Sequence, residues 1–185
     1  PLLQEFFPEQ LRDVSLDQFY RGINKVEPSL IRTEADELTY HFHIMIRYEL
    51  EKALLEGSLQ VNEIPAYWNE QYPSYLGVEV PNDTKGCLQD VHWSHGSFGY
   101  FPTYSLGSFY AAQLYNAANQ AIPDLASQIQ KGETSTLLSW LSKRVHHFGR
   151  RYISEELSRE VSGETLNIQY FMGYVSEKYK YIYDF

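Results

Sequence analysis

The spacing of apolar residues along the chain predicts a series of helices and almost no sheet. Apolar side chains recur at intervals of three and four residues in several stretches, which is the period of a helix with one buried face. The longer predicted helices cover residues 34–56, 102–119, 134–148 and 152–161, and the chain from 167 onward. We therefore expect an all-α fold, with one short β segment near residues 24–31 as the exception, in a single helical domain over residues 1–185.

Capping residues set the expected helix starts. The run SLDQ at residues 15–18 is a capping box, which opens a short helix. Thr33 is a natural N-cap for the long helix that follows, with Asp36 at its third position. Arg47 and Glu51 are spaced as an ion pair outside its buried face. The apolar face expected of this helix consists of Leu38, Phe42, Met45, Ile46 and Ala53.

The stretch from residue 86 to 113 gathers glycines, aromatic residues and functional polar groups more densely than any other part of the chain. Burying polar groups costs free energy unless each finds a partner. The chain therefore either ties these groups into a structural network or uses them on a ligand. The first part of the stretch predicts a loop or a short strand. In extended form Asp90 and His92 would point to the same side, where the carboxylate would fix the tautomer of the imidazole and raise its pKa.

From Pro102 onward this stretch becomes helical in pattern, because proline suits the first turn of a helix. Small residues and a near-absence of charge predict a helix that is buried nearly all round. Tyr104, one turn from its start, would place its hydroxyl near the histidine-bearing loop.

Composition narrows the class of protein. The chain has 185 residues, of which 43% are hydrophobic, so it is long enough for a real core. Its formal net charge of −9 argues against nucleic-acid and membrane partners. A single cysteine, Cys87, excludes an internal disulfide. We find no signal peptide and no run of about twenty apolar residues, and we expect a cytoplasmic location.

Several familiar chemical motifs are missing from the chain. His92 and His95 are spaced as a metal pair could be, but no third ligand accompanies them. The sequence contains no His-Glu-x-x-His motif, no nucleophile elbow and no glycine-rich phosphate loop. The residues alone therefore indicate a helical domain in which an arginine, a histidine beside an aspartate, and a tyrosine could line one pocket, without indicating a reaction.

Two longer runs resemble a known family. The run IRTEAD at residues 31–36 is similar to the I-R-x-x-A-D motif of the Taq-type zinc metallocarboxypeptidases, and GCLQDVHW at 86–93 matches their G-x-x-Q-D-x-H-W motif. The runs GYFPTYSLG at 99–107 and AAQ at 111–113 also resemble that family. The resemblance covers essentially the whole chain and implies an almost entirely helical enzyme that removes C-terminal residues from peptides.

The resemblance also implies which parts of such an enzyme this chain supplies. The zinc ligands of the family belong to a His-Glu-x-x-His motif and a later glutamate, and we expect both upstream of Pro1. The chain would then be the C-terminal, substrate-binding portion, inactive alone, with the N-terminal part of the same enzyme as its partner. The expected cofactor of the full-length enzyme is zinc or cobalt, its substrate a peptide with a free C-terminus, and its assembly a homodimer.

The family resemblance assigns roles to individual residues. Arg32 would bind the terminal carboxylate of the peptide, which a guanidinium group can pair bidentately. Tyr104 would donate a hydrogen bond to the developing oxyanion or the leaving amine, with His92, oriented by Asp90, as a second donor. The expected supporting residues are Asp90, Gln89 and Asp36.

Two alternatives stay open at this point. Asp90, Gln89 and Trp93 could serve only to hold their loop. The whole chain could also be a non-catalytic helical protein-interaction module that shares the family's ancestry.

Overall fold

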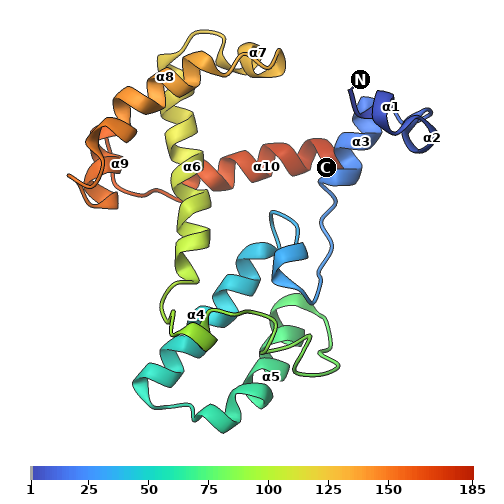
Figure 1. The fold of residues 1–185 in the computed structure, drawn as a ribbon, viewed down its shortest axis with the longest axis vertical. Coiled ribbons are helices and arrows are strands. Elements are labelled where there is room, and N and C mark those ends of the chain that lie inside the picture. The colour runs from blue at the N-terminus through green and yellow to red at the C-terminus, as the bar shows by residue number, and fades with distance from the viewer. Residues whose placement is uncertain (1) are drawn as a thin grey trace. The chain divides into compact units, whose positions relative to one another are not determined.

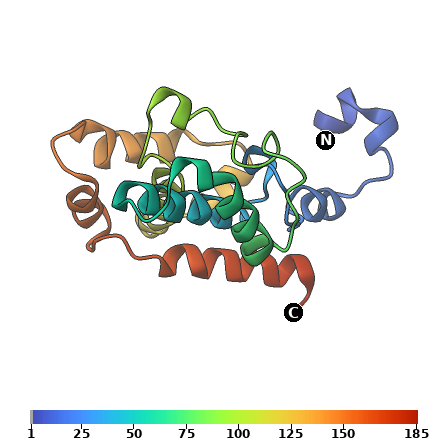
Figure 2. The ribbon, with the colours of Figure 1, turned by 90° about the horizontal axis from the view of Figure 1, so that it is seen from below.

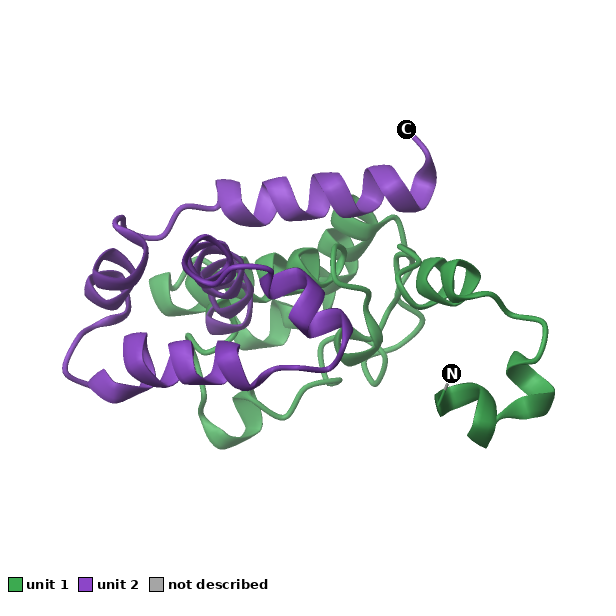
Figure 3. Ribbon diagram, turned by 90° about the horizontal axis from the view of Figure 1, so that it is seen from above, with its two compact units in different colours: residues 1–102 green, residues 103–185 purple. Residues whose placement is uncertain are grey.

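The computed structural model describes residues 2–185, in which helices are joined by turns and loops (Figures 1 and 2). This part of the chain contains no β-strand, so the expected all-α class is confirmed. The chain divides into two compact units, residues 1–102 and residues 103–185 (Figure 3). The single domain expected over residues 1–185 stays a prediction.

The first unit opens with three short helices, α1 (Leu2–Phe6), α2 (Pro8–Leu11) and α3 (Leu16–Ile23). The predicted capping box of α3 is confirmed. The backbone N–H of Gln18 donates to Ser15 Oγ over 3.1 Å, and the backbone N–H of Ser15 donates to Gln18 Oε1 over 2.9 Å. These reciprocal bonds satisfy N–H groups that the helix itself leaves unpaired.

The segment after α3 is not the short β segment expected near residues 24–31. Residues 25–29 have no regular secondary structure. Their backbone groups find side-chain partners instead, as when the N–H of Glu27 donates to Asp36 Oδ2 over 3.0 Å. Because a β-strand is defined by pairing with a second strand, a segment held by side chains stays irregular.

The long helix α4 (Tyr40–Glu56) begins later than the predicted cap at Thr33. A short 3₁₀ helix, η1 (Arg32–Glu34), comes first. Asp36 then stops the chain from continuing directly into α4, because its Oδ1 accepts the backbone N–H of Thr39 over 2.8 Å. An aspartate that binds a backbone group three residues ahead favours a turn over a helix interior.

The buried face of α4 differs from the predicted one. Phe42 and Met45 are 38% and 46% exposed, although they were expected to face the core. Arg47 and Glu51, expected outside the buried face, are 0% and 2% exposed. Hydrophobic periodicity did not predict the buried face of α4, because charged side chains with partners elsewhere in the chain occupy buried positions. The residues that α4 buries are His43, Ile44, Ile46, Arg47, Leu50 and Glu51.

Helix α5 (Ile64–Leu76) packs against α4 and follows the 3₁₀ helix η2 (Val61–Glu63). Helix α5 has 13 residues and includes Pro73. Each large apolar side chain buried between these helices contributes about 1.5–3 kcal/mol. The buried residues of this core are Ile46, Leu50, Trp68, Tyr72, Leu76 and Cys87.

The loop after α5 lies on this core. At Gly86 an added Cβ would lie 2.8 Å from Val80 Cγ1 and 3.0 Å from the backbone oxygen of Asn82, so only glycine fits. The loop expected around Asp90 and His92 is present, whereas the short strand that was its alternative is not. His92 has φ −56° and ψ −49° and opens the 3₁₀ helix η3 (Trp93–His95), so the side-chain alternation of a strand does not apply.

The second unit consists of helices alone. Helix α6 (Pro102–Ala121) begins at the predicted proline. Ile168 is the N-cap of the last helix, and Asn167 Oδ1 accepts the backbone N–H of Gln169, the first residue of that helix, over 3.0 Å. The other elements are α7 (Leu125–Gln130), α8 (Ser135–Arg144), η4 (His146–Phe148), α9 (Ser154–Ser162) and α10 (Gln169–Tyr183).

Helix α6 is far less buried than predicted. Only Gln113 and Ala118 of this helix are buried. An added Cβ at Gly107 would meet no atom within 4 Å among the described residues, so no close helix contact requires a small residue there. Gln113 instead holds the loop before α10, where its Nε2 donates to Ser162 Oγ over 2.8 Å and its Oε1 accepts the N–H of Asn167 over 2.9 Å.

Candidate functional site

The two sequence runs around Arg32 and Asp90 meet in the first unit. The backbone N–H of Arg32 donates to Gln89 Oε1 over 2.9 Å. Gln89 Nε2 in turn donates to the backbone oxygens of Leu30, over 3.0 Å, and Gly86, over 3.1 Å. One amide side chain thus ties the loop at residues 86–89 to the segment before η1. Three predicted site residues, Arg32, Gln89 and Asp90, therefore belong to one cluster.

Arg32 is held by Asp90 through charge-assisted hydrogen bonds. Its Nε and Nη2 donate to Asp90 Oδ1 over 2.9 and 2.6 Å. Its Nη1 donates to the hydroxyl of Tyr40, the first residue of α4, over 2.9 Å. Only 7% of Arg32 is exposed. The guanidinium group is therefore fixed in one orientation, rather than free to swing from the surface.

Arg47 binds the second oxygen of the same carboxylate. Its Nε and Nη2 lie 2.7 and 2.6 Å from Asp90 Oδ2, and its Nη1 donates to the backbone oxygen of His43 over 2.8 Å. Sequence reasoning missed this residue. One signal was present, because His43, Arg47 and Glu51 recur every four residues beside the buried Ile46, which places three polar groups on one helix face.

Aromatic rings cover the two guanidinium groups. Arg47 lies over the ring of Trp68, 4.6 Å from its centroid, and over that of Phe101 at 5.3 Å. Arg32 lies 5.6 Å from the centroid of Phe101. Such contacts add cation–π attraction to the ion pairs and exclude water from them. Phe101 is fully buried between its neighbours, which makes the cluster part of the core of this unit.

Asp90 stays ionised inside this cluster. Burial by itself raises the pKa of the Asp90 carboxyl, but hydrogen bonds from Arg32 and the charges of Arg47 and Arg32 outweigh it, so the pKa lies below its ordinary value. The pKa of Arg32 is raised, because its bonds to Asp90 outweigh burial. The cluster therefore contains two permanent positive charges and one permanent negative charge near neutral pH.

His43 lies beneath the cluster and is uncharged. Its Nδ1 lies 3.0 Å from the hydroxyl of Tyr72, and its side chain is fully buried. Burial, followed by the charges of Arg47 and Arg32, lowers the pKa of His43 from 6.5 to about 4.

This low pKa predicts a pH dependence of stability. Because the unfolded histidine binds a proton near pH 6.5 and the folded one only near pH 4, the contribution of His43 is complete above pH 6.5 and is lost as the pH falls toward 4. We expect a loss of about 3 kcal/mol in the free energy of unfolding over this range, measured by urea denaturation. His43→Gln should remove that loss, whereas the exposed control His95→Gln should keep it. Equal pH dependence in both variants would contradict the assignment.

His92 lies at the edge of this cluster. Its ring centroid is 4.3 Å from that of Phe101. Burial lowers its pKa, Asp90 raises it, and the charges of Arg32, His95 and Arg47 lower it again, with a net decrease. The expected increase in the pKa of His92 is therefore wrong, because burial, together with the charges of Arg32, His95 and Arg47, outweighs the effect of Asp90. Asp90 acts on His92 through its charge, while its ion pairs go to Arg32 and Arg47.

The other predicted site residues have different surroundings. Asp36 accepts backbone N–H groups and so shapes the entry to α4. Trp93 Nε1 donates to Glu51 Oε1 over 2.8 Å, and the N–H of Gly99 donates to Glu51 Oε2 over 3.0 Å, which fixes the loop around η3. Tyr104 belongs to α6 in the second unit, where it is half-buried.

The described residues offer no set of metal ligands. No group of three or more histidine, cysteine, aspartate or glutamate side chains within residues 2–185 is arranged to hold an ion. The rings of His92 and His95 are 6.1 Å apart between centroids, without a third ligand nearby. In the same part of the chain no helix is both long and apolar enough to cross a membrane.

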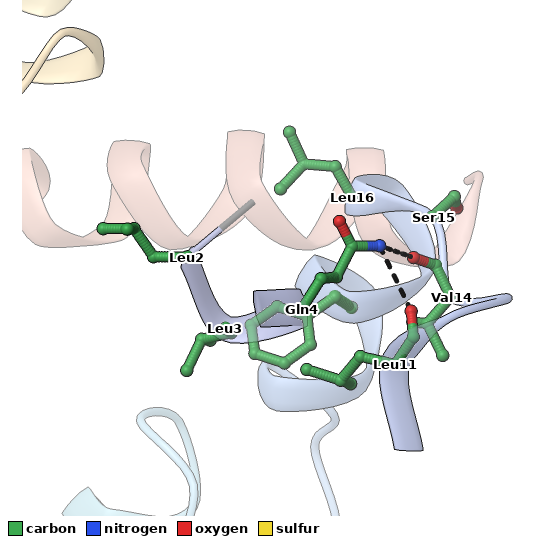
Figure 4. Close-up of a pocket in the computed structure, with 8 residues that line it drawn as sticks. Leu2, Leu3, Gln4, Leu11, Val14, Ser15 and Leu16 are labelled. Carbon is green, nitrogen blue, oxygen red and sulfur yellow. Dashed lines mark hydrogen bonds between the residues drawn. The ribbon is translucent and has the colours of Figure 1, made fainter. Parts of the chain in front are cut away.

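A separate groove of about 630 Å³ lies among the first three helices of this unit (Figure 4). Its polar side chain Gln4 donates to the backbone oxygens of Leu11, over 3.1 Å, and Val14, over 3.4 Å. None of its lining residues has an acidic or basic side chain, so these residues supply no acid–base group. The groove is lined by Leu2, Leu3, Gln4, Leu11, Val14, Ser15, Leu16 and Phe19.

Comparison with known proteins gives consistent matches. The family model described as carboxypeptidase Taq (M32) metallopeptidase matches residues 1–179. Carboxypeptidase 1 of Bacillus subtilis is 45% identical over 181 residues, which are 98% of this chain and 36% of that protein. Thermostable carboxypeptidase 1 of Thermus thermophilus is 44% identical over 97% of this chain and 36% of its own length.

Solved structures agree with these matches. The crystal structure of an M32 carboxypeptidase from Deinococcus radiodurans has a TM-score of 0.94 and 39% sequence identity, over 99% of this chain and 37% of that chain. A metallocarboxypeptidase of Trypanosoma cruzi has a TM-score of 0.90 at 41% identity, over 97% of this chain and 38% of its own. The chain thus spans little more than a third of the length of these relatives.

Proposed function

Because the chain belongs to the carboxypeptidase Taq (M32) metallopeptidase family, we propose that it forms the substrate-binding part of a metal-dependent carboxypeptidase that removes C-terminal residues from peptides. One observation carries this proposal. The two family motifs, 58 residues apart at Arg32 and Asp90, form one buried cluster held by bonds of 2.6 and 2.9 Å. The residues that made the resemblance specific are therefore also the residues that contact one another.

In this proposal Arg32 recognises the free carboxylate at the C-terminus of the peptide. Asp90 and Tyr40 fix its guanidinium group, so little side-chain entropy is lost when a carboxylate binds. Its 7% exposed fraction is the part that a substrate would meet. Gln89 supports Arg32 by accepting its backbone N–H, and Asp36 fixes the backbone that follows by accepting the N–H of Leu38.

Tyr104 and His92 supply hydrogen bonds to the reacting groups in this proposal. A phenol hydroxyl can donate to a carbonyl oxygen as that oxygen becomes negative, or to the leaving amine. His92 is a second donor, and its lowered pKa supports an uncharged ring that donates one N–H near neutral pH. Support for both roles comes from the family motifs in which these residues stand.

The remaining parts of the proposal concern the whole protein. The family is one of metallopeptidases, and we propose zinc or cobalt as the metal, held by ligands outside residues 1–185 in the N-terminal part of the same enzyme. We further propose a cytoplasmic enzyme that forms a homodimer, and light scattering of the full-length protein tests the dimer directly.

Substitution of Arg32 tests the proposal. In the full-length protein, Arg32→Ala should raise KM for a blocked dipeptide with a free C-terminus by about tenfold to a hundredfold, because a hydrogen-bonded ion pair with substrate is lost. Arg32→Lys keeps the positive charge and should therefore raise KM less than Arg32→Ala does. The exposed Arg12→Ala is the matched control. An unchanged KM in Arg32→Ala, with the fold intact by circular dichroism, would remove Arg32 from substrate binding.

A further inference from the structure

Asp90 is shared between two arginines, one on each carboxylate oxygen. Arg32 Nη2 lies 2.6 Å from Oδ1, and Arg47 Nη2 lies 2.6 Å from Oδ2. Two guanidinium charges and one carboxylate charge leave the triad with one net positive charge. The side chains of all three residues are at most 8% exposed. A buried excess charge costs free energy unless an opposite charge meets it.

Two other carboxylates of this unit bind elsewhere. The carboxylate of Asp36 accepts backbone N–H groups, including those of Glu27 and Thr39. The carboxylate of Glu51 accepts the indole N–H of Trp93 and the N–H of Gly99. Each is satisfied by uncharged donors. The carboxylate that both arginines contact directly is therefore that of Asp90.

Arg47 and Arg32 differ in what they can reach. Arg47 is 0% exposed and is enclosed by Trp68 and Phe101, so it cannot contact a peptide in this structure. Arg32 keeps an exposed fraction of 7%. If Arg32 and Asp90 formed a pair alone, the carboxylate would offset the charge of Arg32. A second arginine on the other oxygen divides the attraction of Asp90 between two partners.

We infer that Arg47 is a positioning residue for substrate recognition, which keeps the triad positive so that Arg32 retains charge for the terminal carboxylate of a peptide. This inference rests on the proposed function of Arg32. Asp90 aligns the guanidinium group of Arg32 but places a negative charge beside it. The positive charge of Arg47 offsets that negative charge. Neither the sequence motifs nor the roles implied by the resemblance include Arg47.

Substitution of Arg47 in the full-length protein tests this inference. Arg47→Met keeps most of the side-chain volume but makes the triad neutral, and KM for a blocked dipeptide with a free C-terminus should rise about tenfold. The value of kcat should change less than about twofold, because the lost charge acts on binding. Arg47→Lys keeps the charge and should raise KM less than Arg47→Met does.

A double variant separates charge from packing. Arg47→Met combined with Asp90→Asn restores one net positive charge, and the amide that replaces the carboxylate still offers an oxygen to Arg32. Its KM should return to within about threefold of the wild-type value. A purely structural role predicts that the double variant binds substrate no better than Arg47→Met, and that result would overturn the inference. If Arg47→Met does not fold, the double variant is compared with wild type by the same threefold criterion.

The outcome for Arg32→Ala distinguishes two kinds of failure. An unchanged KM in Arg32→Ala would overturn the proposed function, and the inference about Arg47 with it. A raised KM in Arg32→Ala without recovery in the double variant would overturn the inference alone.

Discussion

Replacement of Asp90 by alanine is expected to lower the free energy of unfolding by about 3–5 kcal/mol, because it leaves two buried arginines without their shared carboxylate. Arg47 is 0% exposed and Arg32 7%, so water cannot replace the lost partner. Asp83→Ala is the matched control. Asp83 is an exposed aspartate of the same loop, and its loss should change the stability by less than about 0.5 kcal/mol.

Urea denaturation followed by tryptophan fluorescence measures both variants, since Trp68 lies directly on Arg47. The effect should also depend on pH. Because the pKa of Asp90 is lowered in the folded protein, its contribution is complete above the unfolded pKa of about 3.9 and is lost as the pH falls through the lower folded value. A loss below about 1 kcal/mol at pH 7 would show that the arginines do not depend on Asp90.

Replacement of Tyr104 by phenylalanine should lower kcat of the full-length protein by about 10²–10³-fold, the usual cost of losing one hydrogen-bond donor to a developing oxyanion. KM should change little, because that bond strengthens only in the transition state. The substitution removes one oxygen atom from a half-buried side chain, so the fold should be retained.

Tyr115→Phe is the control for this prediction. Tyr115 belongs to the same helix and is 45% exposed. Its kcat should stay near the wild-type value. If Tyr104→Phe also stays within about threefold of wild type, Tyr104 does not act on the reacting groups.

Local signals predicted the helices well where the responsible residues are neighbours in sequence. Ser15 and Gln18 form the predicted capping box, and Pro102 starts α6 as expected. The start of α4 was predicted wrongly, because Asp36 could occupy either a third helical position or a turn. In the structure Asp36 forms the turn, since its Oδ1 accepts the N–H of Thr39, and its Oδ2 accepts the N–H of Glu27 from nine residues away.

The buried face of α4 and the presence of Arg47 in the site could not be predicted, and the physical reason is the same for both. Periodicity treats a charged residue as exposed, but Arg47 is buried because its partner Asp90 lies 43 residues further along the chain. The family motifs led to Arg32, Gln89 and Asp90, which the structure brings together. The motifs could not lead to Arg47, because its contact with Asp90 depends on how the loop after α5 lies on α4.

The most direct test of this account is the release of a C-terminal residue by the full-length protein. A blocked dipeptide with a free C-terminus is compared with the same dipeptide carrying a C-terminal amide, before and after chelation of bound metal. We predict cleavage of the free acid only, loss of activity on chelation, and recovery with zinc or cobalt. Absence of cleavage with every metal added would contradict the account and favour a non-catalytic interaction module.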